Sequence, residues 1–206
     1  MFTGLVTDKG RIASVSDANG VRRFRVESSF DADTIEMGAS IMHSGVCLTV
    51  VDFGSRQTGS WHDVEAIPET LDKSVLGDWA EGQSINLEQS LKLGDELGGH
   101  FVFGHVDCVA EVTNVQEEGG SWRVRIATPD HMAKYLAEKG SVAVDGVSLT
   151  VAAVGEENGR NWFEITVIPH TWDITTIGEL KPGKRVNLEA DMLARYVARM
   201  LGKDKD

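Results

Sequence analysis

The sequence has little positive charge, few cysteines and no long apolar run. Its 20 lysine and arginine residues are outnumbered by 32 aspartate and glutamate residues, which gives a net charge of −12. Nucleic acids and anionic membranes are bound through basic patches, so this balance argues against both partners. No stretch approaches the roughly 20 apolar residues of a membrane span. The first residues also lack the basic start of a secretory signal. We therefore expect a soluble, cytoplasmic protein.

The sequence motifs of several enzyme classes are also missing. The two cysteines, Cys47 and Cys108, do not occupy corresponding places in the chain, and we expect free thiols in a reducing compartment. The six histidines have no HExxH or Cys-x-x-Cys context, so we expect no zinc site. No Gly-x-Ser-x-Gly elbow of a hydrolase is present, and no glycine-rich loop lies between a strand and a helix as in nucleotide-binding folds.

What the sequence does contain is a duplication. The matching segments are Gly45–Val50 with Gly146–Val151, Ile67–Asp72 with Ile168–Asp173 and Gly82–Glu88 with Gly183–Glu189, each at an offset of 101 residues, and Gly4–Val6 with Gly104–Val106 at an offset of 100. A solenoid repeat is usually about 20–50 residues long. The longer period is the length of a small domain, so the sequence predicts two tandem domains.

Each copy has the pattern of a small all-β domain. In the first copy we expect strands over Leu5–Val15, Val21–Glu27, Ala39–His43, Cys47–Phe53, Ser60–Ile67 and Ser84–Glu88, a tight hairpin at Asn19-Gly20, and a short turn or helix from Pro68 to Leu76. In the second we expect strands over Val102–Val115, Trp122–Ala127, Ser141–Val144, Val147–Val154, Trp162–Val167 and Arg185–Glu189, and a helix over Pro129–Lys139. Many short strands with turn signals between them predict a barrel or a sandwich.

The C-terminal segment departs from this pattern. Leu193, Tyr196, Val197 and Met200 recur at helical spacing, which predicts an amphipathic helix over Asp191–Leu201. The first copy has no equivalent. This helix could pack on its own barrel, but we favour a contact between subunits, because so short a helix is marginal without tertiary packing.

The repeated hexamers carry the most distinctive polar side chains. Alternation along a strand places Cys47 and Thr49 on one face, and Ser148 and Thr150 on the equivalent face of the second copy. Serine and threonine are common on the wet face of a strand, but the duplication of the pair favours a site that grips a polar heterocycle. His100 follows two glycines where the two domains must meet, which distinguishes it from the other histidines.

Three segments in combination closely resemble the riboflavin synthase family of the alpha-chain type, which is built from lumazine-binding repeats. They are the opening Met1–Val6, the two hexamers, and the connector Gly98–Val106, and the resemblance covers nearly the whole chain. It implies two tandem six-stranded Greek-key β-barrels at 1–97 and 98–190, and a trimerising helix and tail at 191–206. It also raises an association with lumazine synthase.

The resemblance further implies a reaction. Two 6,7-dimethyl-8-ribityllumazine molecules would dismutate to riboflavin and 5-amino-6-(D-ribitylamino)uracil with no added cofactor and no metal. The productive site would lie between the N-terminal barrel of one subunit and the C-terminal barrel of the next. Which barrel holds the donor, which side chain is the base, and whether Cys47 is a nucleophile stay open.

The same resemblance implies the site residues. One substrate site takes Gly4, Leu5, Val6, Cys47, Leu48, Thr49, Glu65, Ala66, Ile67, Pro68, Glu69 and Thr70. The other takes Gly99, His100, Phe101, Ser148, Leu149, Thr150, Thr166, Val167, Ile168, Pro169, His170 and Thr171, and Lys139 reaches a ligand of the neighbouring subunit. The implied catalytic residues are Phe2, Cys47, His100, Ser148, Thr150 and Asp191. Relatives often have Lys and Glu where this sequence has Pro68 and His170, and Leu where it has Trp172, which we interpret as a packing residue.

Two alternatives remain open. A lumazine- or flavin-binding antenna protein can be built on the same fold without turnover, although such proteins typically degrade the second site, which is intact here. A duplicated barrel used only for protein contacts would leave the paired polar faces unexplained.

Overall fold

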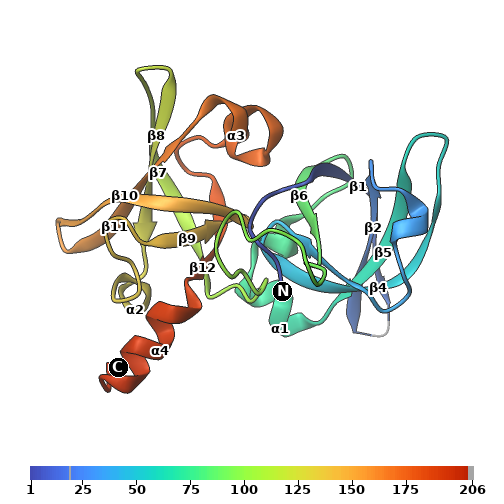
Figure 1. The fold of residues 1–206 in the computed structure, drawn as a ribbon, viewed down its shortest axis with the longest axis horizontal. Coiled ribbons are helices and arrows are strands. Elements are labelled where there is room, and N and C mark those ends of the chain that lie inside the picture. Colours follow the sequence, from blue (N-terminus) through green and yellow to red (C-terminus); the bar gives the residue numbers. More distant parts are fainter. Residues whose placement is uncertain (19, 204–206) are drawn as a thin grey trace.

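The computed structural model describes residues 1–18 and 20–203. In this part of the chain, twelve strands form two closed antiparallel barrels that lie side by side (Figure 1). This confirms the predicted fold class. The hairpin expected at Asn19-Gly20 includes Asn19, which lies outside the described residues.

The N-terminal barrel contains the first six strands. They are β1 (Asp8–Ala18), β2 (Val21–Ser28), β3 (Ser40–His43), β4 (Val46–Ser55), β5 (Ser60–Ala66) and β6 (Ser84–Gln89), with the short helices η1 (Ala32–Thr34), α1 (Pro68–Lys73) and η2 (Val75–Asp78) between them. The strands close in the order β1-β2-β5-β4-β3-β6. The pairing of β2 with β5 and of β3 with β6 is the non-sequential pairing of a Greek key.

The C-terminal barrel repeats this arrangement. Its strands are β7 (Cys108–Glu118), β8 (Ser121–Thr128), β9 (Ser141–Val144), β10 (Val147–Glu157), β11 (Arg160–Val167) and β12 (Arg185–Ala190), its short helices are α2 (Asp130–Ala133), α3 (Pro169–Ile174) and η3 (Thr176–Glu179), and α4 (Met192–Met200) follows the barrel. The closed order β10-β11-β8-β7-β12-β9 is equivalent to that of the first copy. Irregularities in the strand register recur as well, between Ile12 and Ser14 in β1 and between Val112 and Asn114 in β7.

The core of each barrel follows from the alternation of side chains along its strands. On β2, Phe24 and Val26 are fully buried, whereas Arg23 and Arg25 point outward, where both bind the carboxylate of Asp63. The apolar face of every strand is thus turned into its own barrel. Two separate cores result, and the ligand-facing residues must lie on the outer faces.

The two barrels contact each other through their β3–β4 and β9–β10 turns. A Cβ on Gly146 would lie 2.7 Å from the backbone nitrogen of Gly45, so only glycine permits this approach. Phe2 and Val102 form an isolated antiparallel bridge beside the turns, and both side chains are fully buried. The relative position of the barrels is therefore fixed by close backbone packing.

Three sequence predictions about elements need correction. The helix expected over Pro129–Lys139 is limited to Asp130–Ala133, because the chain continues in tighter turns in which the N–H groups of Tyr135 and Leu136 donate three residues back, to Met132 and Ala133. The first strand of each copy begins later than predicted, at Asp8 and at Cys108. The segments before these residues lie between the barrels, hydrogen-bonded to the last strand of their own barrel and to the hexamer of the other.

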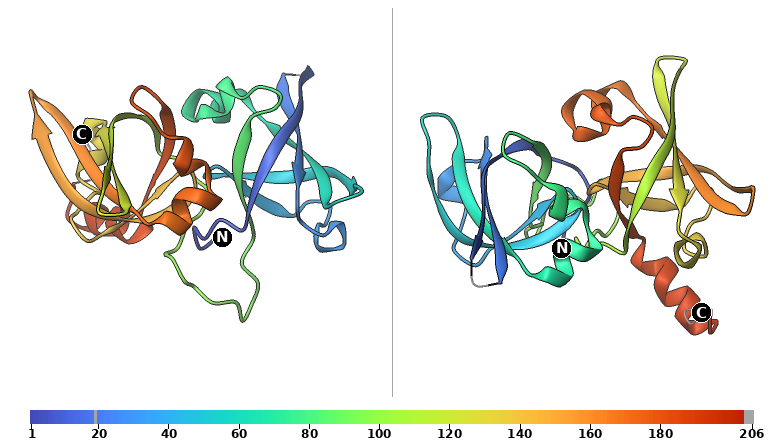
Figure 2. Two further views of the ribbon diagram at one scale, coloured as in Figure 1. Left: turned by 90° about the horizontal axis from the view of Figure 1, so that it is seen from above. Right: turned by 180° about the vertical axis from the view of Figure 1, so that it is seen from behind.

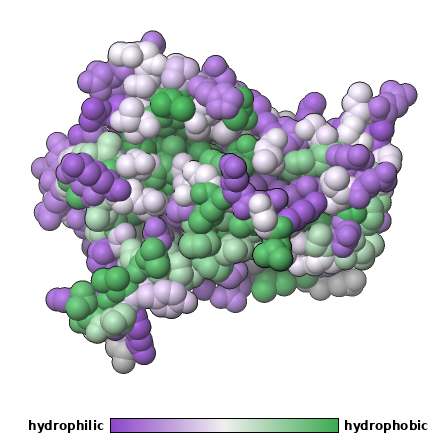
Figure 3. Space-filling model, viewed as in Figure 1, coloured by the Kyte–Doolittle hydropathy of each residue, from purple (hydrophilic) through white to green (hydrophobic). Residues whose placement is uncertain are grey.

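Helix α4 confirms the predicted C-terminal helix, and it projects from the C-terminal barrel (Figures 1 and 2). The stripe of Leu193, Tyr196, Val197 and Met200 is exposed, by 55% at the least. Figure 3 shows this apolar surface along the projecting helix. Within the described residues, no helix is both long enough and apolar enough to cross a membrane.

Candidate ligand-binding sites

The repeated hexamers lie on β4 and β10 with the orientation that alternation predicts. Thr49 and Thr150 are exposed, Cys47 and Ser148 are half-buried, and the residues between them point into the barrels. The side chains of the predicted site residues Leu48 and Leu149 therefore belong to the two cores, at 5% and 9% exposure. Only their backbone can face a ligand.

The segment before each barrel's first strand lies against the hexamer of the other barrel. The N–H of Ser148 donates to the carbonyl of Gly4 over 2.8 Å, and the N–H of Cys47 donates to the carbonyl of Gly104 over 2.8 Å. The predicted grouping placed Gly4–Val6 with Cys47, whereas in the structure Gly4 lies beside Ser148 and Val6 packs on the core of the C-terminal barrel. Gly104–Val106, which the prediction omitted, take their place beside Cys47.

A cavity of about 220 Å³ lies at the N-terminal site. Its lining includes Cys47, Glu69, Thr70, Gly104, His105 and Val106. The predicted residues Cys47, Glu69 and Thr70 are thus brought together. The match between Gly4–Val6 and Gly104–Val106 was the sequence signal that could have identified the second segment as part of a site.

The ends of β5 and β11, with the loops that follow them, carry the predicted substrate contacts 65–70 and 166–171. Each begins with an extended strand end and continues into a one-turn helix that starts with proline, at Pro68 and at Pro169. Within these loops the side chains of Ala66 and Val167 are buried in the barrels. Those exposed to solvent are Glu65, Ile67, Pro68, Glu69, Thr166, Ile168, Pro169 and His170.

His100 and Ser148 form the centre of the C-terminal site. The His100 Nδ1 and the Ser148 Oγ share a hydrogen bond of 2.7 Å. The backbone N–H of His100 donates to the carbonyl of Thr3. Burial lowers the pKa of His100, while the nearby Asp191 carboxylate acts in the opposite direction. Its Nε2 is buried without a partner in the described structure. A neutral imidazole with one free nitrogen can take or relay a proton.

Gly99 permits this arrangement. A Cβ on Gly99 would lie 2.1 Å from the carbonyl oxygen of Thr3 and 2.9 Å from the Ser148 Cβ. Any side chain would therefore separate the connector from β10. The predicted residues Gly99, His100 and Ser148 are brought together, with Gly4 packed against them.

Phe2 and Asp191, predicted to be catalytic, do not line the cavity at the N-terminal site. Phe2 is fully buried in an apolar cluster with Met42, Val102 and Ala143, against which Cys47 packs. Asp191 precedes α4, and its Oδ1 accepts a hydrogen bond from the N–H of Leu193. Phe2 thus touches the back of the N-terminal site, and Asp191 links the helix to the surroundings of His100.

Three predicted residues are exposed to solvent and do not line the cavity at the N-terminal site. Leu5 and Phe101 are 48% and 44% exposed, and Lys139 is exposed on the turn before β9. Exposed apolar side chains beside a half-open site are typical of surfaces that another molecule covers.

The C-terminal loop has an aromatic support that the first copy lacks. Trp172 of α3 stacks on Trp122 of β8 with ring centroids 4.5 Å apart and planes 5° from parallel. This confirms the interpretation of Trp172 as a packing residue. The corresponding positions in the first copy are Leu71 and Arg22.

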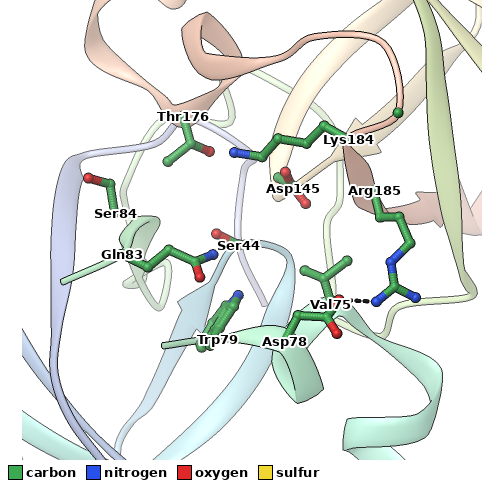
Figure 4. Close-up of a pocket in the computed structure, with 11 residues that line it drawn as sticks. Ser44, Val75, Asp78, Trp79, Gln83, Ser84, Asp145, Thr176, Lys184 and Arg185 are labelled. Carbon is green, nitrogen blue, oxygen red and sulfur yellow. Dashed lines mark hydrogen bonds and ion pairs between the residues drawn. The ribbon is translucent and has the colours of Figure 1, made fainter. Parts of the chain in front are cut away.

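A second cavity of about 220 Å³ lies between the barrels and contains none of the predicted site residues (Figure 4). Ser44 and Gln83 of the first copy face Asp145 and Lys184 of the second. Burial raises the pKa of Asp145 to about 7, opposed by the bond from the Asn187 N–H and by the charge of Lys184. The carboxylate therefore changes charge near neutral pH at the contact between the barrels.

Comparisons with known proteins agree with this geometry. Residues 3–90 and 103–191 each match the family model described as the lumazine binding domain. The chain is 47% identical to riboflavin synthase of Brucella abortus (strain 2308), over 97% of this chain and 98% of that protein, and 40% identical to riboflavin synthase of Mycobacterium bovis over 98% of both. The crystal structure of LumP complexed with 6,7-dimethyl-8-(1'-D-ribityl)lumazine is 25% identical, with a TM-score of 0.77 over 92% of this chain and 99% of LumP.

Proposed function

This chain belongs to the riboflavin synthase family, and from that membership we propose that it converts two 6,7-dimethyl-8-ribityllumazine molecules into riboflavin and 5-amino-6-(D-ribitylamino)uracil. The activity is supported by identity to riboflavin synthases over nearly the full length of both chains. The observation that carries the mechanism is the pair of similar but unlike polar sites, Cys47 beside Gly104 on one barrel and Ser148 beside Gly4 and His100 on the other. A reaction between two copies of one molecule needs such a pair.

The two sites differ in their polar side chains. The N-terminal pocket combines Cys47 with His105, and the C-terminal site combines Ser148 with His100. This asymmetry supports different roles for the two bound molecules, one as donor and one as acceptor of the four-carbon unit. Holding both in place makes a bimolecular encounter effectively intramolecular, which is a large source of acceleration.

His100 and Ser148 are the residues we assign to proton transfer. The reaction requires a proton to leave the C7 methyl group of one lumazine, which the ring acidifies. Neutral His100 can accept that proton at Nδ1 through Ser148, along the 2.7 Å hydrogen bond between them. Thr150, exposed on the same face of β10, completes the polar wall.

We further propose a homotrimer in which the productive site lies between the N-terminal barrel of one subunit and the C-terminal barrel of the next. The exposed stripe of α4 and the exposed Leu5 and Phe101 support this assembly, because each presents apolar surface to solvent in the single chain. Lys139 would then reach the neighbouring subunit's ligand. An association with lumazine synthase, which would supply the substrate, belongs to the same proposal.

The proposed domain boundaries are 1–97, 98–190 and 191–206. Strands β1–β6 lie in the first range, β7–β12 in the second and α4 in the third, of which residues 204–206 lie outside the described residues. We also propose a cytoplasmic location, supported by the two unpaired thiols of Cys47 and Cys108.

The test is incubation of the purified protein with 6,7-dimethyl-8-ribityllumazine alone. Flavin absorbance should rise with one riboflavin formed for every two lumazines consumed. Tight binding of lumazine without turnover would instead identify an antenna protein, and no binding would identify a barrel that serves protein contacts.

Substitutions test the assigned residues. His100→Ala should lower turnover by about two orders of magnitude, as expected for loss of a general acid–base group, with the barrels still folded by circular dichroism. Ser148→Ala should lower turnover more than Cys47→Ala, because only Ser148 is hydrogen-bonded to a histidine in the described structure. Equal effects of these two variants would remove the assigned asymmetry.

A further inference from the structure

A short motif at the end of each barrel's last strand has no role in the reaction described above. It is Asn86-Leu87-Glu88 on β6 and Asn187-Leu188-Glu189 on β12. The leucines fill the barrel cores, while the asparagines and glutamates are at least 96% buried on the opposite face. Buried glutamate is rare unless it is fully paired, so each of these side chains requires an explanation.

Both glutamates bind backbone N–H groups of the segment that precedes their barrel's first strand. Glu189 accepts hydrogen bonds from the N–H groups of Phe103, Gly104 and His105 at 2.7–3.1 Å. No ion pair joins Glu88 or Glu189 to a basic side chain among the described residues. Their charge is therefore balanced mainly by backbone donors, which fixes the shape of the bound segment.

Glu88 does the same for the N-terminal segment. It accepts from the N–H and the Oγ1 of Thr3 at 2.7 Å each, and from the N–H of Gly4 at 3.0 Å. The hydrogen bonds of Glu88 and those of Glu189 are thus equivalent under the duplication.

The segments bound by the two glutamates also contact the hexamer of the opposite barrel. The carbonyl of Gly104, held by Glu189, accepts the N–H of Cys47, and His105 lines the same N-terminal pocket. The carbonyl of Gly4, held by Glu88, accepts the N–H of Ser148 in the C-terminal site. Each glutamate is therefore connected, through the segment that it binds, to the hexamer of the other barrel.

The two asparagines also bind backbone groups of the opposite barrel. The Asn187 Nδ2 donates to the carbonyl of Ser44, and its Oδ1 accepts from the N–H of Val75, which follows the lining residue Ser74 of the N-terminal pocket. Asn86 makes the reciprocal pair of bonds with Asp145 and Thr176.

We propose that Glu189 is a positioning residue for the lumazine site on the N-terminal barrel, and that Glu88 is a positioning residue for the site on the C-terminal barrel. Each barrel's last strand thus sets the ligand loop of the other barrel's pocket. The proposal rests on the proposed function, since it takes both pockets as lumazine sites.

The test uses double-mutant cycles read by riboflavin binding. The Glu→Gln change keeps the size of the side chain but replaces one acceptor oxygen by an amide that faces a backbone N–H. Glu189→Gln should weaken one of two bound riboflavins about tenfold, or about 1.4 kcal/mol, and Glu88→Gln should weaken the other. The binding is followed by quenching of flavin fluorescence.

The pattern of coupling distinguishes positioning from general damage. Glu189→Gln should be coupled to His105→Ala, and Glu88→Gln to Ser148→Ala, because each pair acts on one site. In the crossed pairs, Glu189→Gln with Ser148→Ala and Glu88→Gln with His105→Ala, the changes in riboflavin affinity should be independent. The affinity of each double variant should then equal the product of the two single effects within about twofold. Glu189→Gln coupled to Ser148→Ala instead, or loss of affinity shared equally by both sites, would overturn the proposal.

A milder variant tests the role of Glu88 even if Glu88→Gln unfolds the protein. Thr3→Val removes one of the three hydrogen bonds to Glu88 and leaves the carboxylate in place. It should weaken only the riboflavin that Ser148→Ala weakens, and unchanged binding at both sites in a folded Thr3→Val variant would contradict the role of Glu88. Failure of the unaltered protein to bind riboflavin or lumazine would instead refute the proposed function, and this inference with it.

Discussion

At the scale of single residues, the two barrels differ most inside their cores. His43 and His62 are fully buried in the N-terminal barrel, with their Nε2 atoms 2.8 Å apart, where the second barrel has Val144 and Phe163. Burial lowers the pKa of His62 to about 4, and burial together with the charge of His62 lowers that of His43. Both histidines are therefore neutral in the fold, and the N-terminal barrel carries a polar contact that its duplicate lacks.

Asp145 gives a prediction for the pH dependence of stability. Its pKa is about 7 in the fold and its ordinary value is 3.8. Between these values the folded state keeps a proton that the unfolded chain has lost, so stability falls as pH rises through this window. The slope is up to about 1.4 kcal/mol per pH unit for one group.

Asp145→Asn should remove that slope and make the protein more stable at pH 8. Asparagine keeps the acceptor for the Asn187 N–H and tolerates the φ of 45° at this position. Urea unfolding at pH 5 and pH 8 measures the effect. Equal pH slopes for the variant and the unaltered protein would show that Asp145 is ionised in the fold at low pH as well.

Part of the site could be predicted from residues alone. Strand alternation placed Cys47 and Thr49 outward, and the structure confirms this. The same alternation turns Leu48 into the core, which a contact carried over from relatives does not reveal. The hydrogen bond between His100 and Ser148 joins residues 48 positions apart, and no local pattern contains it.

At the scale of elements, the exchanged segments are the feature that the sequence did not predict. The apolar alternation from Leu5 to Val15 resembled one strand, but the strand begins at Asp8, and Gly4 before it accepts a hydrogen bond from Ser148 of the C-terminal barrel. A repeat alignment shows which segments are equivalent, not which of them touch. The segments before β1 and β7 are held between the barrels by Glu88 and Glu189, whose hydrogen-bond partners lie 84–86 residues away in sequence.

The turn before β9 gives a prediction about Lys139. It has φ 67° where the first copy has Gly38 at φ 80°, and both N–H groups donate to the equivalent strand. A left-handed conformation costs a non-glycine residue about 1–2 kcal/mol. Such strain is often kept where a side chain has a function.

Lys139→Gly should therefore leave the protein equally or more stable, and should lower kcat/KM at least several-fold if the ammonium group reaches a ligand. Lys139→Arg, which keeps the charge, serves as the matched control and should retain more activity. Thermal unfolding and steady-state kinetics together test this. Full activity in Lys139→Gly would show that the lysine does not reach the substrate.

Helix α4 gives a prediction about assembly. The helix is held to its own barrel by the ion pair of Arg195 with Asp107 and by the buried Ala198, which leaves the apolar stripe outward. Tyr196→Glu with Val197→Glu should dissociate the oligomer from three times the chain mass of 22.4 kDa to the single chain. Turnover should be lost while each barrel still binds riboflavin.

Sedimentation equilibrium measures the mass of this variant. Glu substitutions on the buried side of the helix would unfold it, so the stripe residues are the informative positions. An unchanged mass with unchanged turnover would show that α4 is not the subunit contact.

At the scale of the whole molecule, the duplication accounts for both the symmetry and the asymmetry of the protein. Strand patterns and the 101-residue period predicted two equivalent barrels. Their relative position could not be predicted, because it depends on the contact of Gly45 with Gly146 and on reciprocal asparagine bonds. The result is a frame that holds two related polar sites of different chemistry.

The count of ligands bound per chain tests this account most directly. Calorimetric titration with riboflavin should give two sites per chain of unequal affinity, one weakened by His105→Ala and the other by Ser148→Ala. A single site per chain, weakened by both substitutions alike, would contradict the account of one pocket on each barrel.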